Sequence, residues 1–183
     1  GAKTEPYYFH AISAELPRGL VTVEVHGLGT NTLDLIDRTL ELKVVSHSTP
    51  PFDQVWAVFD RDSFPAHHFD NAIRKAASHG ICCAWSNEAF ELWYVLHFED
   101  RSVPMQRQDY EGKLSAYLDL RYQKNDPSIY VALQARGDQA KAVERAVRLE
   151  AARKSSNIAP SSANPCTTVH LLVEELMQFK NPS

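Results

Sequence analysis

Long hydrophobic runs are missing from this sequence of 183 residues. No stretch approaches the roughly 18 consecutive apolar residues that a bilayer-spanning helix needs, so a helical membrane protein is not expected. With 44% hydrophobic and 23% charged residues, the chain still has enough apolar side chains for an ordinary core. The composition predicts one folded domain, or one domain with a modest extension, rather than a disordered chain.

Cysteine is scarce. The chain contains only Cys82, Cys83 and Cys166, which form neither a disulfide framework nor a C-x-x-C zinc or redox motif. Cys82 and Cys83 are adjacent in a strand-like segment, and we expect both as small core residues. This cysteine content predicts a protein of the reducing cytoplasm.

Positive charge is not in excess either. The chain has 19 Lys and Arg residues against 23 Asp and Glu residues, which gives a net charge of −4. A global positive field of the kind that attracts nucleic acid is therefore absent. Any contact with nucleic acid would have to come from a local patch.

Strand and helix patterns alternate in the first half of the chain. Strand patterns occur at 20–25, 54–62 and 81–85, and helical patterns at 4–16, 31–45, 66–79 and 87–98. The run from Val55 to Phe59 is continuously apolar, as in a parallel strand covered on both faces. This alternation predicts an α/β domain with a parallel sheet flanked by helices over residues 1–100.

After residue 100 the pattern changes to helix. Apolar residues recur with helical spacing in three segments, 106–123, 128–154 and 165–179. Turn residues at 125–127 and a Ser/Asn/Pro-rich stretch at 155–165 separate them. We therefore expect a helical C-terminal extension over residues 101–183.

Two acidic residues follow the most apolar strand. Ligands of open α/β sheets bind beyond the carboxyl ends of the strands, which is where Asp60 and Asp62 stand. Their spacing places both carboxylates on one side of an extended chain, where they repel unless a cation lies between them. Such hard oxygen ligands suit Mg²⁺ or Mn²⁺. The alternative is a solvated strand end whose charge is neutralised by Arg61 or another neighbour.

Further candidates lie at the starts of two helices. Glu91 is in the first turn of the apolar helix 87–98, so it is expected to be buried and to need a partner or a metal. Its alternative role is that of a carboxylate stabilised by the helix dipole. Glu5 begins the first helix on the same expected edge. His97, in the same apolar helix as Glu91, is interpreted as a hydrogen-bonded core residue.

Basic and aromatic residues of the second half are candidates for nucleic-acid binding. Lys141, Arg145 and Arg148 share one face of a predicted helix and would follow a row of phosphates. The alternative is a solvated face, because glutamates are interleaved with them. Lys124 lies in a loop-like segment and is a further candidate. Three tyrosines, Tyr117, Tyr122 and Tyr130, would either stack on bases or pack in the core.

Several of these segments together resemble the RloB-like family, whose core is a Toprim-type α/β domain. The resemblance lies in GAKTEPYYF (1–9), VWAVFDRDS (55–63), SNEAFELWYVLHFE (86–99), YQKNDPSIY (122–130) and NPCTTVHLLVEEL (164–176). It covers nearly the whole chain, and the pair FDRD and SN-x-x-FELW is specific in combination. The implied fold is a Toprim-like Rossmannoid sheet.

The resemblance also implies roles for residues. Toprim domains hold one or two divalent cations with a glutamate after the first strand and a D-x-D after a later one, which Asp60 and Asp62 match. Asn87 and Glu91 fall in the motif after the next strand, and Glu5 matches the second acid of an E-G-x-x-T-E type motif. The first residue of the chain matches the glycine after that first glutamate, so we expect the first strand and its acid to precede this sequence.

The implied activity is metal-dependent phosphodiester cleavage of RNA, with tRNA as one candidate, or of DNA. Lys3 is a candidate for neutralising the transition state. Such proteins act in phage defence or restriction, often beside an AAA- or ABC-type ATPase partner. Two alternatives stay open: an inactive Toprim-like adaptor for such an ATPase, and a haloacid-dehalogenase-like phosphatase with Asp60 as nucleophile. The strand predicted before the D-x-D disfavours the phosphatase.

Overall fold

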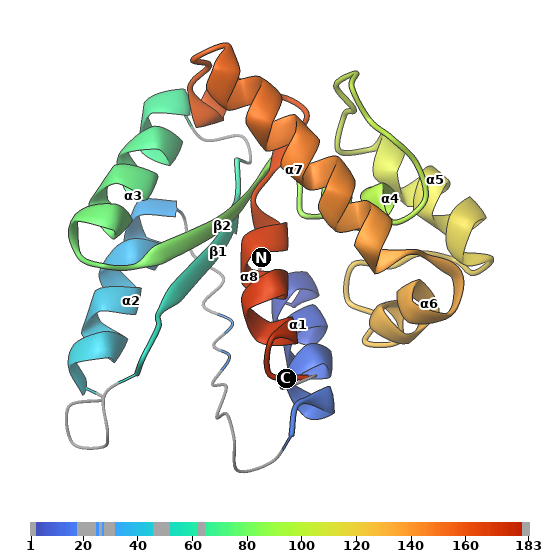
Figure 1. Cartoon of the computed structure of the whole chain (residues 1–183), viewed down its shortest axis with the longest axis horizontal. Helices are drawn as coiled ribbons and strands as arrows, with labels where there is room; N and C mark the ends of the chain where they lie inside the picture. Colours follow the sequence, from blue (N-terminus) through green and yellow to red (C-terminus); the bar gives the residue numbers. More distant parts are fainter. Residues whose placement is uncertain are drawn as a thin grey trace.

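The computed structural model describes residues 3–17, 25, 27, 32–45, 52–61 and 65–180. These residues form eight α-helices, one 3-10 helix and three strands, arranged as in Figure 1. In chain order they are α1 (Thr4–Glu15), α2 (Thr32–Val45), β1 (Trp56–Asp60), α3 (Ala66–Ser78), β2 (Cys82–Asn87), α4 (Glu91–Leu96), α5 (Asp109–Leu118), α6 (Ile129–Arg136), α7 (Gln139–Ser155), η2 (Pro160–Ser162), β3 (Cys166–Thr167) and α8 (Val169–Met177).

The described strands form a small mixed sheet in the order β1–β2–β3. β1 runs parallel to β2, with Trp56 opposite Cys82 and Asp60 opposite Ser86. β3 is antiparallel to β2. The predicted α/β class and the β1–α3–β2 unit are confirmed, but these strands do not establish an all-parallel Toprim sheet. The strand predicted at 20–25 lies outside the described residues except for Val25.

β3 corrects the prediction of a helix over 165–179. The helix α8 begins only at Val169, and the two residues before Thr168 pair with the end of β2 instead. Thr168 completes this pairing, because its hydroxyl accepts from the Trp85 amide at 2.9 Å and its own amide donates to the Trp85 carbonyl at 2.8 Å. A two-residue strand has no periodicity of its own, so it left no pattern in the sequence.

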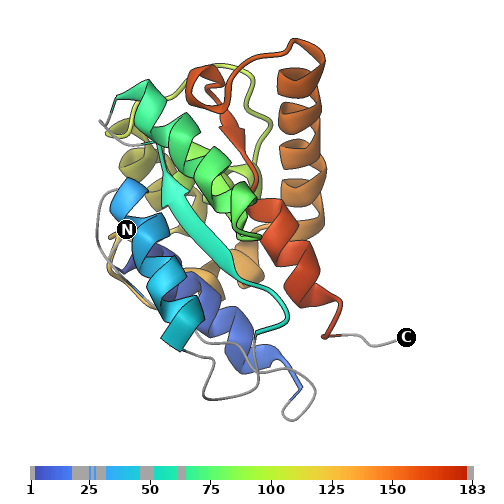
Figure 2. The same cartoon turned by 90° about the vertical axis from the view of Figure 1, so that its left-hand side faces the viewer.

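The sheet separates two hydrophobic cores. Ala57 and Phe59 of β1 and Trp85 of β2 pack with α2 and α3, which lie side by side across one face (Figure 2). Trp56 and Val58 point to the other face, where they contact the core built by the remaining helices. β1 is therefore covered on both sides, as its continuous apolar run predicted.

The second core joins the two halves of the sequence. Trp93 of α4 donates from its indole nitrogen to the Tyr8 hydroxyl of α1 at 2.8 Å. The same core contains Leu114 of α5, Leu133 of α6 and residues of α7 and α8. α7 packs against α4 and β3, and α8 against β2 (Figure 1). No helix in the described part of the chain combines the length and the apolar character needed to cross a membrane.

The helix predicted over 128–154 is divided in two. α6 ends before Gly137, and α7 starts after Asp138, whose carboxylate accepts from the Lys141 amide at 2.9 Å as an N-cap. At the junction, Gly137 lies so close to α4 that a Cβ atom there would be 2.8 Å from the Cβ of His97. Close packing against α4 thus sets the position of the break.

Candidate functional site

The predicted acidic residues come from three different elements. Asp60 is the last residue of β1, Glu91 begins α4 after the short connection 88–90 that follows β2, and Glu5 lies in the first turn of α1. β1 and β2 are parallel neighbours, so their carboxyl ends meet at one edge of the sheet, as expected for a ligand site. Asp62 lies outside the described residues.

The charges of these carboxylates act on one another. Glu5 and Glu91 are buried, and the Asp60 side chain is only 14% exposed. Burial raises the pKa of Asp60 well above its usual value, and the negative charges of Glu5 and Glu91 raise it further. The structure therefore brings these three acids together in a place with little water.

The two carboxylate oxygens of Asp60 differ in their surroundings. Oδ2 lies 3.5 Å from Nη2 of Arg107, whose positive charge partly offsets the rise in the pKa of Asp60. Oδ1 is buried and has no hydrogen-bond partner among the described residues. A buried carboxylate oxygen without a donor is costly, and such an atom calls for an explanation such as an ion.

Glu91 is held by two side chains from the 119–128 segment. Its Oε1 accepts from the Tyr122 hydroxyl at 3.2 Å and lies 3.1 Å from Nζ of Lys124. The Lys124 carbonyl in turn accepts from the Thr4 hydroxyl at 2.7 Å, which ties this segment to the start of α1. Tyr122 is buried, so it packs in the core rather than presenting its ring for stacking.

A cleft of about 620 Å³ opens beside Glu91. Its lining comes from α4, α5 and the segment after α5, and includes Arg107, Tyr110 and Lys124. The Tyr110 hydroxyl is buried and has no hydrogen-bond partner among the described residues. Burial, followed by the nearby charge of Glu91, raises the pKa of Tyr110, so this hydroxyl stays protonated at neutral pH.

The carboxylates fit a hard divalent cation by their chemistry. Buried carboxylate oxygens are preferred ligands of Mg²⁺ and Mn²⁺, and the orphaned Oδ1 of Asp60 is suited to such an ion. Within the described residues, however, no group of three or more His, Cys, Asp or Glu side chains is close enough to form a metal site as it stands. A complete ligand set would need Asp62 or other groups in addition.

The model of the RloB-like family matches residues 1–176 of the chain. The chain belongs to the RloB-like family. Searches among curated proteins and among solved structures gave no match. The match spans every acidic residue discussed above and the whole cleft, so the site lies within the part of the chain that the family model covers.

Two other predicted residues of this RloB-like protein lie at the same edge but differ in their contacts. The Asn87 amide donates to the carbonyls of Pro160 at 3.2 Å and Ser161 at 3.0 Å, so it fastens η2 to the end of β2. Lys3 is exposed directly before α1. Neither arrangement assigns a catalytic role.

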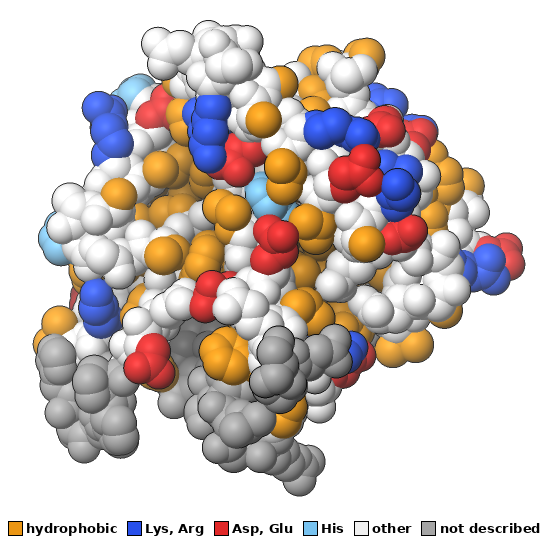
Figure 3. All heavy atoms as spheres, viewed as in Figure 1, with side chains coloured by type: hydrophobic (Ala, Val, Ile, Leu, Met, Phe, Trp, Pro, Cys, Tyr) orange, Lys and Arg blue, Asp and Glu red, His pale blue; other side chains and the backbone are white. Residues whose placement is uncertain are grey.

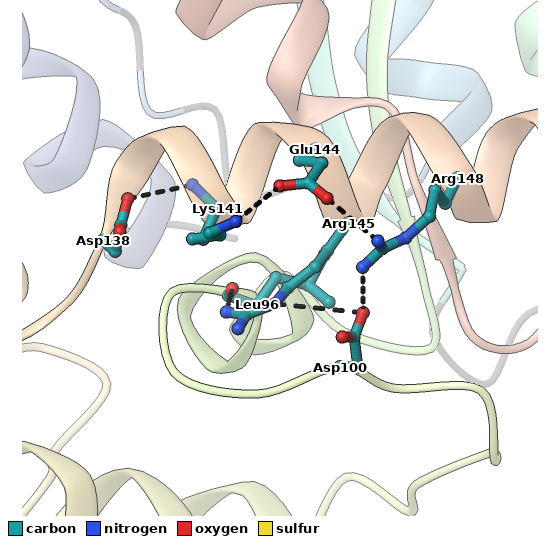
Figure 4. A network of polar contacts seen from close by, with 7 residues as sticks. All are labelled: Leu96, Asp100, Asp138, Lys141, Glu144, Arg145 and Arg148. Carbon is teal, nitrogen blue, oxygen red and sulfur yellow. Dashed lines mark hydrogen bonds and ion pairs between the residues drawn. The ribbon is translucent and has the colours of Figure 1, made fainter.

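The predicted basic stripe on α7 is occupied by intramolecular contacts (Figure 4). Glu144 pairs with Lys141 and with Arg148, each at 3.0 Å, and Arg148 also pairs with Asp100. Arg145 is largely buried and donates to the Leu96 carbonyl at 2.6 Å. Lys and Arg side chains are interleaved with acidic ones over this face (Figure 3), and the binding of phosphates by this stripe stays a prediction.

His97 is buried as predicted, but the expected hydrogen bonds are wrong. Neither ring nitrogen has a partner among the described residues, since the ring is enclosed by Trp93, at 5.2 Å between ring centroids, and by Gly137. Burial lowers the pKa of His97 to about 4.

Of the two adjacent cysteines that were expected in the core, Cys83 is half-buried, but Cys82, the first residue of β2, is exposed and not in the core.

Arg107 and Tyr110 were missed by the sequence analysis. Both lie in a segment where only helical periodicity was visible, and Tyr110 occupies an apolar position of that period. Only the packing of α5 against α4 reveals that they face the carboxylates. The one indication in the sequence was that Tyr110, which has an apolar ring and a polar hydroxyl, stands at a predicted core position.

Proposed function

We propose that this RloB-like protein is a divalent-cation-dependent nuclease that hydrolyses phosphodiester bonds in RNA or DNA. The observation that carries the proposal is the gathering of Glu5 of α1, Asp60 at the end of β1 and Glu91 at the start of α4, with the pKa of Asp60 raised by burial and further by the other two charges. Carboxylates brought together away from water repel one another, and a shared cation relieves that repulsion. The family membership agrees with the proposal.

The residues would act by binding and orienting. Asp60 and Glu91, with Glu5 and Asp62, would hold Mg²⁺ or Mn²⁺, which when bound activates water and stabilises charge on the leaving oxygen. Burial of Glu5 and Glu91 keeps the carboxylates dry, so their negative charges would attract a bound cation more strongly. Lys124 and Arg107, which already lie at the carboxylates, and Lys3 nearby in sequence to Glu5, supply positive charge at the same edge.

The proposal extends to the biological setting. Membership of the RloB-like family supports a role in anti-phage defence, together with an AAA- or ABC-type ATPase as partner.

A catalytically inactive adaptor is the second candidate. It is favoured by the pairing of Glu91 with Lys124 and of Asp60 with Arg107, because basic side chains already neutralise part of the acidic charge. An adaptor with this arrangement would bind its ATPase without any need for a cation.

A cleavage assay separates the two candidates. The protein, expressed from its full coding sequence, is incubated with labelled tRNA and with supercoiled DNA in Mg²⁺ or Mn²⁺. Cleavage should disappear with EDTA and in Asp60→Asn, while Asp53→Asn, an exposed acid before the other end of β1, retains it. The substrate that is cut identifies the class. Intact folding without cleavage of either substrate would favour the adaptor.

A further inference from the structure

The cleft beside Glu91 contains three hydrogen-bond donors that face acidic groups or have no acceptor. Arg107 and Lys124 stand at its carboxylate side, and Tyr110, whose hydroxyl is buried without a partner among the described residues, also lines it. Its volume of about 620 Å³ is within the range of sites that bind small molecules or a nucleotide-sized segment. These three donors could therefore share one acceptor group of a ligand bound in the cleft.

The Tyr110 hydroxyl indicates that an acceptor is missing. The residue is 1% exposed, and its hydroxyl has no hydrogen-bond partner in the described part of the chain. Buried hydroxyls in folded proteins are almost always paired, so one that lines a cleft without a partner points to a ligand. Because this hydroxyl stays protonated, the ligand must offer an acceptor such as a phosphate oxygen.

The side chains of Lys124 and Arg107 can each pair either with a carboxylate or with a ligand in the cleft. Glu91 is buried, whereas the Lys124 side chain that pairs with it is 49% exposed. Arg107 is 35% exposed, and its Nη2 lies 3.5 Å from Asp60 Oδ2 and donates to the Glu88 carbonyl at 3.4 Å, both at the long end for a hydrogen bond. Both side chains are long and flexible, so each head group can leave its carboxylate and reach into the cleft.

The negative charge of the cleft lining favours binding of a cation before binding of a phosphate. Glu91 and Glu111 both line the cleft, and Asp60 lies close by. A phosphate entering while the carboxylates hold no cation would meet these like charges. A divalent cation on the carboxylates removes that repulsion and makes the pairs with Lys124 and Arg107 redundant.

We infer that this cleft binds the phosphodiester backbone next to the scissile bond through Lys124, Arg107 and the Tyr110 hydroxyl, and that cation binding at the carboxylates releases the two basic side chains for this role. The inference deepens the proposed nuclease function and rests on it. Lys124 and Arg107 thereby link cation loading to substrate binding. Tyr110 acts as a neutral donor in the same subsite.

The test is equilibrium binding of short fluorescent single-stranded RNA and DNA oligonucleotides, measured by anisotropy in Ca²⁺ and in EDTA. The wild-type protein should bind about tenfold or more tightly in Ca²⁺ than in EDTA. Lys124→Met should weaken binding in Ca²⁺ by about tenfold and reduce the slope of log K against log salt by about one. Comparison of the RNA and DNA arms identifies the preferred backbone.

Two variants make the inference specific. Glu91→Gln should bind more tightly than wild type in EDTA, because Lys124 no longer has a charged partner. Tyr110→Phe keeps the ring and should weaken binding in Ca²⁺ several-fold without lowering the melting temperature, since the hydroxyl has no partner to lose. Lys75→Met is the matched control, because Lys75 also pairs with a carboxylate, Asp37, on the opposite face of the sheet.

The outcomes separate this inference from the nuclease proposal. If Lys124→Met and Tyr110→Phe bind as tightly as Lys75→Met, the subsite is refuted even when the protein cleaves nucleic acid. If binding follows the expected pattern but no cleavage occurs under any cation, the subsite is supported and the nuclease proposal fails. Equal wild-type binding in Ca²⁺ and EDTA would overturn the release of the basic side chains.

Discussion

Two buried acids, Glu150 and Asp60, differ in how far the surrounding fold satisfies their carboxylates. The carboxylate of Glu150 lies 3.4 Å from His170 Nε2 and 2.7 Å from Lys154 Nζ, and these contacts, chiefly the one with His170, lower its pKa to about 2. Asp60 is also largely buried, but its pKa is raised and its Oδ1 has no partner among the described residues. Glu150 is satisfied by contacts within the fold, whereas Oδ1 of Asp60 is left for the cation that we propose.

His97 leads to a prediction about pH. Burial is the main cause of its lowered pKa of about 4; nearby Asp138 opposes this shift and Arg145 adds to it. The unfolded chain binds a proton near pH 6.5, but the folded protein does not until about pH 4. Stability present above pH 6.5 should therefore be lost as the pH falls toward 4, by about 3 kcal/mol from this residue. Denaturant unfolding across this pH range measures the loss.

The control replaces the titrating ring. His97→Phe should flatten the stability profile between pH 6.5 and 4, because no proton can bind at this position. His10→Gln, on the exposed side of α1, should leave the profile as in the wild type. A profile that is equally steep in His97→Phe would show that other groups cause the acid sensitivity.

At the scale of elements, the junction between α6 and α7 leads to a second stability prediction. A Cβ atom at position 137 would lie 2.8 Å from the Cβ of His97 and 2.9 Å from the carbonyl oxygen of Leu133. Neither neighbour is the end of a flexible side chain, so α4 and α6 would have to separate. Gly137→Ala should therefore lower the free energy of unfolding by about 1–3 kcal/mol, measured by urea denaturation.

A second glycine in a helical segment provides the matched comparison. A Cβ atom at Gly112, inside α5, would meet no atom within 4 Å. Gly112→Ala should raise the free energy of unfolding by about 0.5–1 kcal/mol, because alanine reduces the freedom of the unfolded chain. If alanine changed the free energy of unfolding in the same direction at both positions, the packing described for Gly137 would be contradicted.

The sequence predicted those elements whose side chains repeat with a clear period. β1, β2 and the helices α1 to α3 were found close to their observed bounds, since each contains an uninterrupted strand or helix pattern. The helix predicted over 87–98 is wrong in its bounds, because Asn87 ends β2 and α4 spans only Glu91–Leu96. β3 and the break at Gly137 depend on contacts with β2 and His97, which are distant in sequence. Arg107 and Tyr110 were missed for the same reason: their position relative to the carboxylates is a property of tertiary packing.

At the scale of the whole molecule, the candidate site joins segments from the two halves of the chain. Glu5, Asp60 and Glu91 come from the first hundred residues, while Arg107 and Lys124 follow them. The Thr4–Lys124 hydrogen bond and the shared core connect these segments independently of any ligand. The site is thus assembled only when the whole fold is formed, and a cation that binds there binds the native state alone.

This coupling predicts that a divalent cation stabilises the protein against heat. At a concentration 100 times its dissociation constant, a cation bound only by the native state adds about 2.7 kcal/mol, which raises the melting temperature by about 5–10 °C in a chain of this size. Mg²⁺ or Mn²⁺ should produce this shift in the wild type and in Asp53→Asn, and a much smaller one in Asp60→Asn, by differential scanning calorimetry. Asp60→Asn should in turn be the more stable protein in EDTA, because the substitution removes a buried charge beside Glu5 and Glu91. A shift of equal size in Asp60→Asn would place the cation elsewhere on the molecule, and no shift in the wild type would favour the adaptor over the nuclease.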